Sequence, residues 1–170
     1  REKLARESGA ALLDPLRHEV IVDAPPSEVW KAFTTAEGLK SWMVPLAEID
    51  LRVGGVMRTN YNKDGTLGDG GTIENTILSF HPGRMLSIKA TKAPEKFPFK
   101  AQIENMWSVL YFEPTEDGRT RVSCYGFGWD ESAMSQSMRT HFDTGNQWTL
   151  NKLREHFANS KAASEASAAR

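Results

Sequence analysis

Histidine, cysteine and acidic side chains are the groups in this sequence that could hold a metal ion or attack a substrate. The four histidines are scattered, and no two of them have the four-residue spacing that places both rings on one helical face. The one cysteine, Cys124, lies in an apolar, strand-like stretch where a buried thiol is the expected role. We therefore predict no metal site, no cofactor and no thiol nucleophile.

General acid–base catalysis stays open, because its two groups can come from distant parts of a chain without forming a motif. The candidates are His141, Asp143 and Glu104. In a helix, His141 would share one face with Met138 and Trp148 and point inward. The alternative is a histidine at the helix edge that bonds to water or to the backbone. A buried pair of histidine and carboxylate inside a cavity would favour catalysis.

The elements that must position these groups begin with a strand and two helices. Residues 16–23 are rich in β-branched side chains and predict a strand. A helix follows from Pro25, because proline suits a first helical turn and Glu28 complements the helix dipole there. A second short helix is predicted over residues 37–42.

Beyond these helices the apolar residues alternate, which is typical of strands with one buried face. Short turns such as His81-Pro82-Gly83 separate the alternating stretches, so successive strands should pair antiparallel. The predicted strands cover residues 48–53, 57–61, 72–80, 84–91, 105–113 and 119–129.

One long helix closes the predicted order of elements, from Ser132 to Phe157, with apolar residues at helical spacing. A curved sheet needs an element to fill its hollow side, and this helix is the only candidate. We therefore predict an α+β fold in which the final helix packs against a curved antiparallel sheet.

Composition fits one soluble globular domain and excludes two classes of partner. The 170 residues carry 21 basic and 22 acidic side chains, a net charge of −1, and no basic stripe, so we expect no nucleic-acid partner. No apolar run approaches the roughly 20 residues of a membrane span. The sequence begins at Arg1 rather than at Met, so export is compatible with it, while the cytoplasm is favoured.

The chain divides into three parts by composition. Residues 1–15 are a mixed N-terminal extension, residues 16–158 contain all the predicted strands and helices, and residues 159–170 form a tail rich in Ala and Ser. Such a tail buries little apolar surface, and we expect it to fray.

Five short segments in a fixed order resemble one known family. They are Val22 to Thr34 (VDAPPSEVWKAFT), Gly38 to Met43 (GLKSWM), Glu48 to Gly55 (EIDLRVGG), His81 to Leu86 (HPGRML), and Gly145 to Trp148 (GNQW) with Leu150 and Leu153. Taken together, over about residues 16–158, they resemble the small bacterial members of the SRPBCC (START/Bet v-like) superfamily that are related to the activator of the heat-shock-protein-90 ATPase.

The resemblance implies a helix-grip fold, with two short helices after the first strand and a cavity between the bent sheet and the C-terminal helix. Superfamily members use this cavity for lipids, sterols, polyketides and other hydrophobic molecules, and a minority are enzymes. The sequence shows no counterpart of the N-terminal domain that accompanies the eukaryotic activator, so we expect no chaperone partner. It has Trp42-Met43 where many relatives carry two tryptophans, so its cavity mouth is expected to differ.

We predict that the protein binds a small hydrophobic molecule in this cavity. Side chains two residues apart on a strand, and three or four apart on a helix, share a face, and Gly145 would leave room for a ligand. The predicted ligand-binding residues are Trp42, Met57, Tyr61, Trp107, Tyr111, Met138, His141, Phe142 and Trp148.

Two other functions stay open at this point. The first is an enzyme such as a cyclase, dehydratase or hydrolase that acts on a hydrophobic substrate through His141. The second is an interaction module that modulates a chaperone ATPase. The identity of the ligand and the oligomeric state are left open.

Overall fold

The computed structural model describes residues 13–170, so most of the predicted N-terminal extension lies outside the described residues. The order of elements matches the predicted one, with one additional short helix, α4. The elements are β1 (Leu16–Val22), α2 (Pro26–Thr34), α3 (Ala36–Trp42), β2 (Leu46–Ile49), β3 (Val56–Asn60), β4 (Ile73–His81), β5 (Met85–Lys92), α4 (Lys100–Ile103), β6 (Trp107–Pro114), β7 (Thr120–Phe127) and α5 (Ala133–Ala168).

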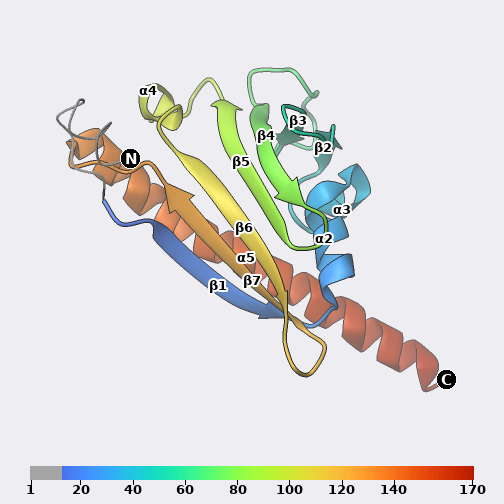
Figure 1. Ribbon diagram of the computed structural model, residues 1–170. Helices are drawn as coiled ribbons and strands as arrows, with labels where there is room; N and C mark the ends of the chain where they lie inside the picture. The colour runs from blue at the N-terminus through green and yellow to red at the C-terminus, as the bar shows by residue number, and fades with distance from the viewer. Residues whose placement is uncertain (1–12) are drawn as a thin grey trace.

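The strands form one seven-stranded antiparallel sheet in the order β1-β7-β6-β5-β4-β3-β2. Figure 1 shows the sheet curving around α5, with β1 running alongside the helix and β4 and β5 rising away from it. The fold is therefore the predicted helix-grip α+β fold. No helix in residues 13–170 is both long enough and apolar enough to cross a membrane.

Helices α2 and α3 form a compact corner whose geometry follows from local chemistry. Pro26 occupies the first turn of α2, and Thr35 caps α3 by accepting a hydrogen bond from the Gly38 N–H at 2.9 Å. A side chain at Gly38 would collide with the Lys31 carbonyl, so this corner requires glycine. The corner thereby holds α3 close to one end of the sheet.

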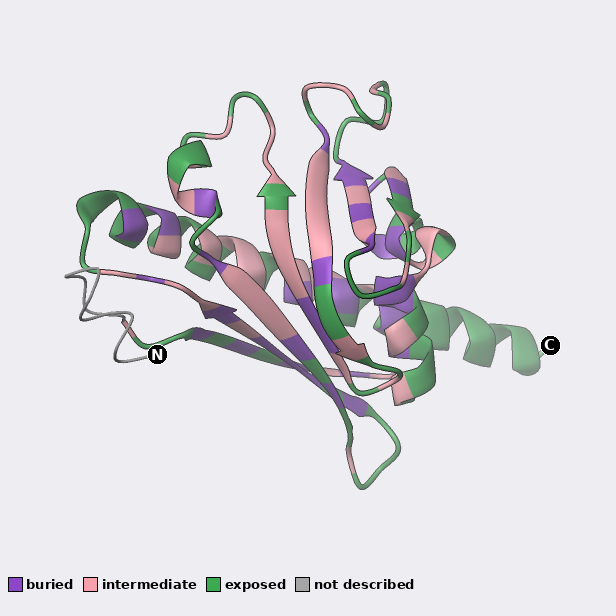
Figure 2. Cartoon of the chain, turned by 45° about the horizontal axis from the view of Figure 1, so that its top comes forward, coloured by how far each residue is buried: buried purple, intermediate pink, exposed green. Residues whose placement is uncertain are grey.

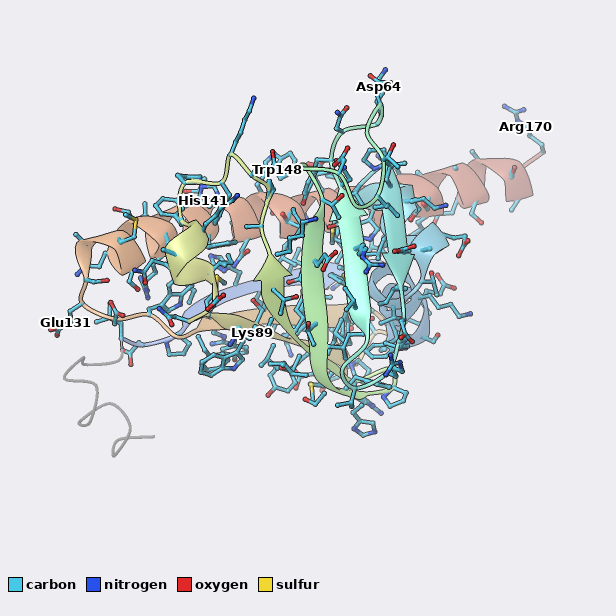
Figure 3. All side chains as sticks on the ribbon, turned by 90° about the horizontal axis from the view of Figure 1, so that it is seen from above. Asp64, Lys89, Glu131, His141, Trp148 and Arg170 are labelled. Atoms are coloured by element: carbon cyan, nitrogen blue, oxygen red, sulfur yellow. The ribbon has the colours of Figure 1, made fainter. Side chains whose placement is uncertain are left out.

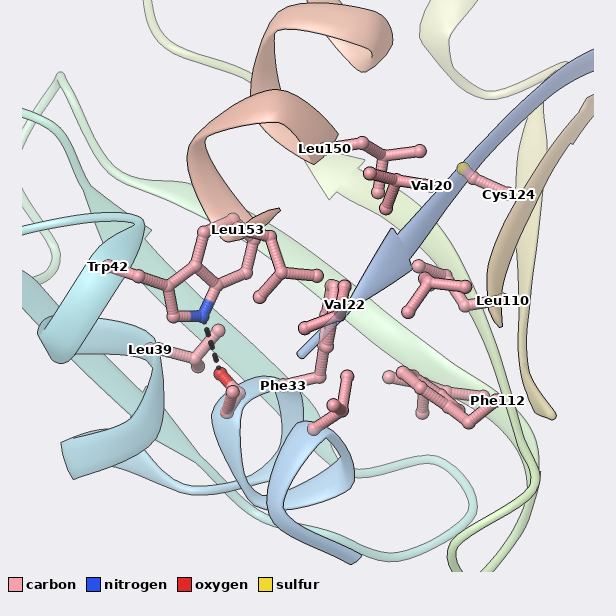
Figure 4. Packing of buried hydrophobic residues seen from close by; sticks show 14 of the residues in the cluster. Val20, Val22, Phe33, Leu39, Trp42, Leu110, Phe112, Cys124, Leu150 and Leu153 are labelled. Atoms are coloured by element: carbon pink, nitrogen blue, oxygen red, sulfur yellow. Dashed lines mark hydrogen bonds between the residues drawn. The ribbon is translucent and has the colours of Figure 1, made fainter. Parts of the chain in front are cut away.

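Two clusters of buried side chains hold α5 to the rest of the domain. The larger cluster joins α2, α3 and the sheet to the C-terminal half of α5, where Leu153 is fully buried (Figure 4). The smaller one surrounds Trp129 and Met138 near the start of α5 and includes Ile103 and Met106. The middle of α5, between the two clusters, is packed less completely.

The structure differs from the predicted elements in three places. The alternating sequence pattern predicts a strand over residues 48–53, but β2 ends at Ile49. The strand ends there because Asp50 starts a turn in which Gly54 has a φ of 80°. The four-residue helix α4 was not predicted, since its residues show no helical period. Helix α5 continues to Ala168, where the sequence suggested a fraying tail after residue 158. Alanine has the highest helix propensity and supports this extension without tertiary packing.

The last part of α5 should contribute little to stability, because every residue from 158 to 170 is exposed (Figure 2). Deleting residues 160–170 is expected to change the free energy of unfolding by no more than about 0.5 kcal/mol. Leu153→Ala, within the larger cluster, should lower it by about 2–5 kcal/mol. Urea unfolding of both variants measures this, and a large loss on deletion would show that the extension packs against the domain.

Candidate ligand-binding site

A cavity of about 480 Å³ lies between the inner face of the sheet and the middle of α5. Its volume falls within the range of about 300–1,000 Å³ that is typical of small-molecule sites. The two buried clusters bound it at its ends, with Phe33, Leu39 and Leu150 at one end and Ile103 and Met106 at the other. The space is therefore the part of the domain interior that neither cluster fills.

Strand alternation gives the cavity its apolar wall. Met57 on β3, Leu86 and Ile88 on β5, and Leu110 on β6 line it. Their neighbours Arg58 and Glu74 instead form an ion pair at 3.0 Å between β3 and β4 and do not line the cavity. The inner face of the middle strands is thus mostly apolar, as a binding surface for a hydrophobic molecule requires.

Six of the nine predicted site residues line this cavity, and they come from three separate parts of the chain. Tyr61 follows β3, and Trp107 begins β6. His141, Phe142 and Trp148 lie on α5, and Figure 3 shows His141 and Trp148 along the helix. The six are Met57, Tyr61, Trp107, His141, Phe142 and Trp148.

Three predicted residues do not line the cavity. Trp42 is a core residue at the corner of α2 and α3, where its indole N–H donates to the Ala32 carbonyl at 2.9 Å. Met138 lies one turn before His141, where α5 already packs on Trp129 in the smaller cluster. Both residues are buried, and they belong to the packing around the cavity and not to its wall.

Tyr111 is the third, and its prediction fails for a reason of strand geometry. The inward residues of β6 are Ser108 and Leu110, so Tyr111 points to the outer face, where 43% of its surface is exposed. There it stacks edge-on against Tyr125 at 5.9 Å and borders a depression between Arg17 and Arg121. Trp107 lies on the same outward face of β6, and its ring stacks on Phe127 at 5.3 Å between ring centres. As the first residue of the strand, Trp107 still borders the cavity.

The segment from β5 to β6 supplies wall residues that the sequence prediction missed. Phe97 lines the cavity, and its ring lies 5.6 Å from His141 and 6.2 Å from Phe142. Phe99 adds a second ring beside His141, at 5.7 Å. Two phenylalanines in a proline-containing loop are a signal of such a contact, because aromatic residues in loops are normally held by packing.

The proposed acid–base pair is not formed. Asp143 accepts a hydrogen bond from Nε2 of His18 on β1, at 2.7 Å, and neither residue lines the cavity. Glu104 is exposed at the end of α4 and does not line the cavity either. Within residues 13–170, His141 has ring contacts but no hydrogen bond to a carboxylate. The described residues therefore form no pair of histidine and carboxylate in the cavity.

Burial determines the state of two ionisable groups in the cavity wall. It raises the pKa of the Cys124 thiol to about 12, and partial loss of hydration also raises the pKa of the Tyr61 hydroxyl, although 53% of the Tyr61 surface is exposed. Both groups are therefore neutral near pH 7, and the thiol is a poor nucleophile. The described residues contain no cluster of three or more side chains able to hold a metal ion.

The bent sheet, the long helix and the cavity between them define a helix-grip domain of the SRPBCC superfamily. More narrowly, the chain belongs to the family described as "Activator of Hsp90 ATPase homolog 1-like protein", whose sequence profile matches residues 23–158. No curated protein sequence matches the chain.

Solved structures share this fold at low sequence identity. The solution structure of the Aha1 dimer from Colwellia psychrerythraea has a TM-score of 0.67 and 18% identity, covering 85% of this chain and 96% of that one. A crystal structure from Mesorhizobium loti has a TM-score of 0.66 and 16% identity, covering 85% and 97%. CalU16 from Micromonospora echinospora has a TM-score of 0.59 and 22% identity, covering 85% and 80%. These similarities establish the fold.

The buried, neutral thiol of Cys124 predicts slow alkylation in the native protein. Iodoacetamide at pH 8 should modify it at least about a hundredfold more slowly than in protein unfolded by guanidinium, because only the thiolate reacts. The rate can be followed by mass spectrometry, since the chain has no other cysteine. Equal rates in the two states would contradict the burial of this side of the cavity.

Proposed function

We propose that this protein binds a small hydrophobic molecule in the cavity between its sheet and α5. The observation that carries the proposal is the open space at Gly145, where an added Cβ atom would meet no heavy atom within 4 Å. Gly145 is half-buried and lines the cavity on α5, between the stretches of the helix that pack into the two clusters. Because Gly145 lines the cavity, the open space next to it is part of the cavity and leaves room for a ligand there.

The walls of the cavity suit such a ligand. Aliphatic side chains and Met57 form the inner wall, and the aromatic rings of Phe97, Phe142 and Trp148 surround the side next to α5. Trp148 keeps 57% of its surface exposed, and Lys152 Nζ lies 4.6 Å from the centre of its ring. A large aromatic residue left exposed at the rim of an apolar cavity is well placed to cover a bound molecule.

Binding without chemistry is favoured over catalysis by the arrangement of polar groups. His141 has no carboxylate partner within the described residues, and the acid nearest to it in sequence, Asp143, is bonded to His18. The Cys124 thiol is neutral. A catalytic pair would need a base oriented by a second group, and residues 13–170 place no such pair in the cavity wall.

Filling the space at Gly145 tests the proposal. Gly145→Leu should lower the affinity for Nile red, a neutral apolar dye, by at least about tenfold, because the new side chain occupies the open space. Gly145→Ala is the matched control: it adds one methyl group, should raise helix stability by up to about 1 kcal/mol, and should keep most of the binding.

Dye fluorescence and quenching of tryptophan emission measure the affinity, and a thermal melt confirms that each variant is folded. Unchanged dye binding by folded Gly145→Leu protein would place the binding site elsewhere. Failure of the unaltered protein to bind the dye would contradict the proposed function itself.

A further inference from the structure

The ionisable groups that line the cavity differ in one respect from those on the rest of the surface. Lys92 and His141 line it, whereas no aspartate or glutamate of the described chain does. Lys92 is half-buried and forms no ion pair with any residue in the range 13–170. The cavity therefore presents basic and neutral groups to a ligand, although the whole chain has a net charge of −1.

These polar groups lie toward one end of the cavity. Tyr61 directly follows β3, and Lys92 is the last residue of β5, and both strands end at the same edge because β4 pairs antiparallel with each of them. His141 reaches this end from α5, since its ring packs on Phe97 and Phe99 in the segment after Lys92. Leu39 and Leu150 lie at the other, apolar end.

Two carboxylates near this end of the cavity form no ion pair with Lys92. Glu74, opposite Lys92 in the sheet, pairs with Arg58 at 3.0 Å. Glu95 lies against Gly70 in the neighbouring loop, where its N–H donates to the Gly70 carbonyl at 2.9 Å. The ammonium of Lys92 is thus left without an ion-pair partner among residues 13–170.

We propose that the ligand is a hydrophobic monoanion, an apolar body carrying one carboxylate that lies between Lys92, His141 and Tyr61. This inference rests on the proposed function and adds the chemical class of the ligand. A carboxylate next to an apolar wall needs charged or polar donors to offset its lost hydration. Lys92 supplies a charge, and Tyr61 and His141 supply N–H or O–H donors. A cationic ligand would meet basic groups without any acid, which disfavours it.

A matched series of probes on the unaltered protein tests the charge preference. Decanoate, decanol and decylamine share one apolar chain, and each can displace Nile red from the cavity. Decanoate should bind about tenfold more tightly than decanol, as expected for one partly exposed charged hydrogen bond, and decylamine should bind no more tightly than decanol. Equal affinities for decanoate and decanol would overturn the inference.

Lys92→Met identifies the group responsible, because methionine keeps an unbranched apolar side chain and removes the charge. The variant should lose about tenfold in affinity for decanoate and remain within about twofold for decanol. Lys89→Met is the control on the same strand (Figure 3), since Lys89 does not line the cavity, and both affinities should be unchanged.

The remaining outcomes separate this inference from the function on which it rests. Equal losses for decanoate and decanol in Lys92→Met would overturn the role of the charge. Binding of Nile red and decanol without any preference for decanoate would overturn the anionic ligand while leaving a hydrophobic cavity. Absence of all binding, dye included, would overturn both.

Discussion

The structure depends on how one helix covers the concave face of a sheet that is wider than the helix. Helix α5 packs chiefly along β1, at one edge, while its axis stays away from the backbones of β3, β4 and β5 (Figure 1). An α-helix with its side chains is about 10–12 Å across, and neighbouring strands are about 4.8 Å apart, so a single helix covers only a few strands. The interior under the remaining strands must be filled by other elements or left open.

Two additional elements fill the ends of this interior. The corner formed by α2 and α3 brings Phe33, Leu39 and Trp42 against the sheet, and the ring of Phe33 lies 5.1 Å from Trp42 and 5.3 Å from Phe112. At the other end, the segment containing α4 brings Ile103 toward Met138. The middle receives neither, and there α5 carries Gly145. The cavity follows from this division of the packing.

Polar groups are divided in a similar way. The hydrogen bond between His18 and Asp143 joins β1 to α5 beside the cavity, at the edge where helix and sheet are closest. Arg58 connects Glu48 and Glu74 across β2, β3 and β4. Acidic groups thus act in tertiary contacts around the cavity, while its wall keeps Lys92, His141 and neutral donors. The location of the acids, more than the number of bases, sets the charge of the cavity wall.

The sequence by itself determined the class of fold, because alternating apolar residues, turn residues and the helical stripe of α5 are local patterns that each element carries within itself. It also predicted an inward face for Met57, Phe142 and Trp148, which line the cavity, although Trp148 keeps 57% of its surface exposed. The sequence could not separate a cavity wall from a packed core. Trp42 and Met138 have the same inward pattern as Met57, and only their tertiary neighbours distinguish them.

The side of the sheet on which Tyr111 lies depended on which face of β6 turns inward. The sequence of β6 does not reveal this, because the strand carries aromatic residues on both of its faces. The contacts of Phe97 with His141, and of His18 with Asp143, join positions far apart in the chain, so only the folded packing of the loop and β1 against α5 decided them.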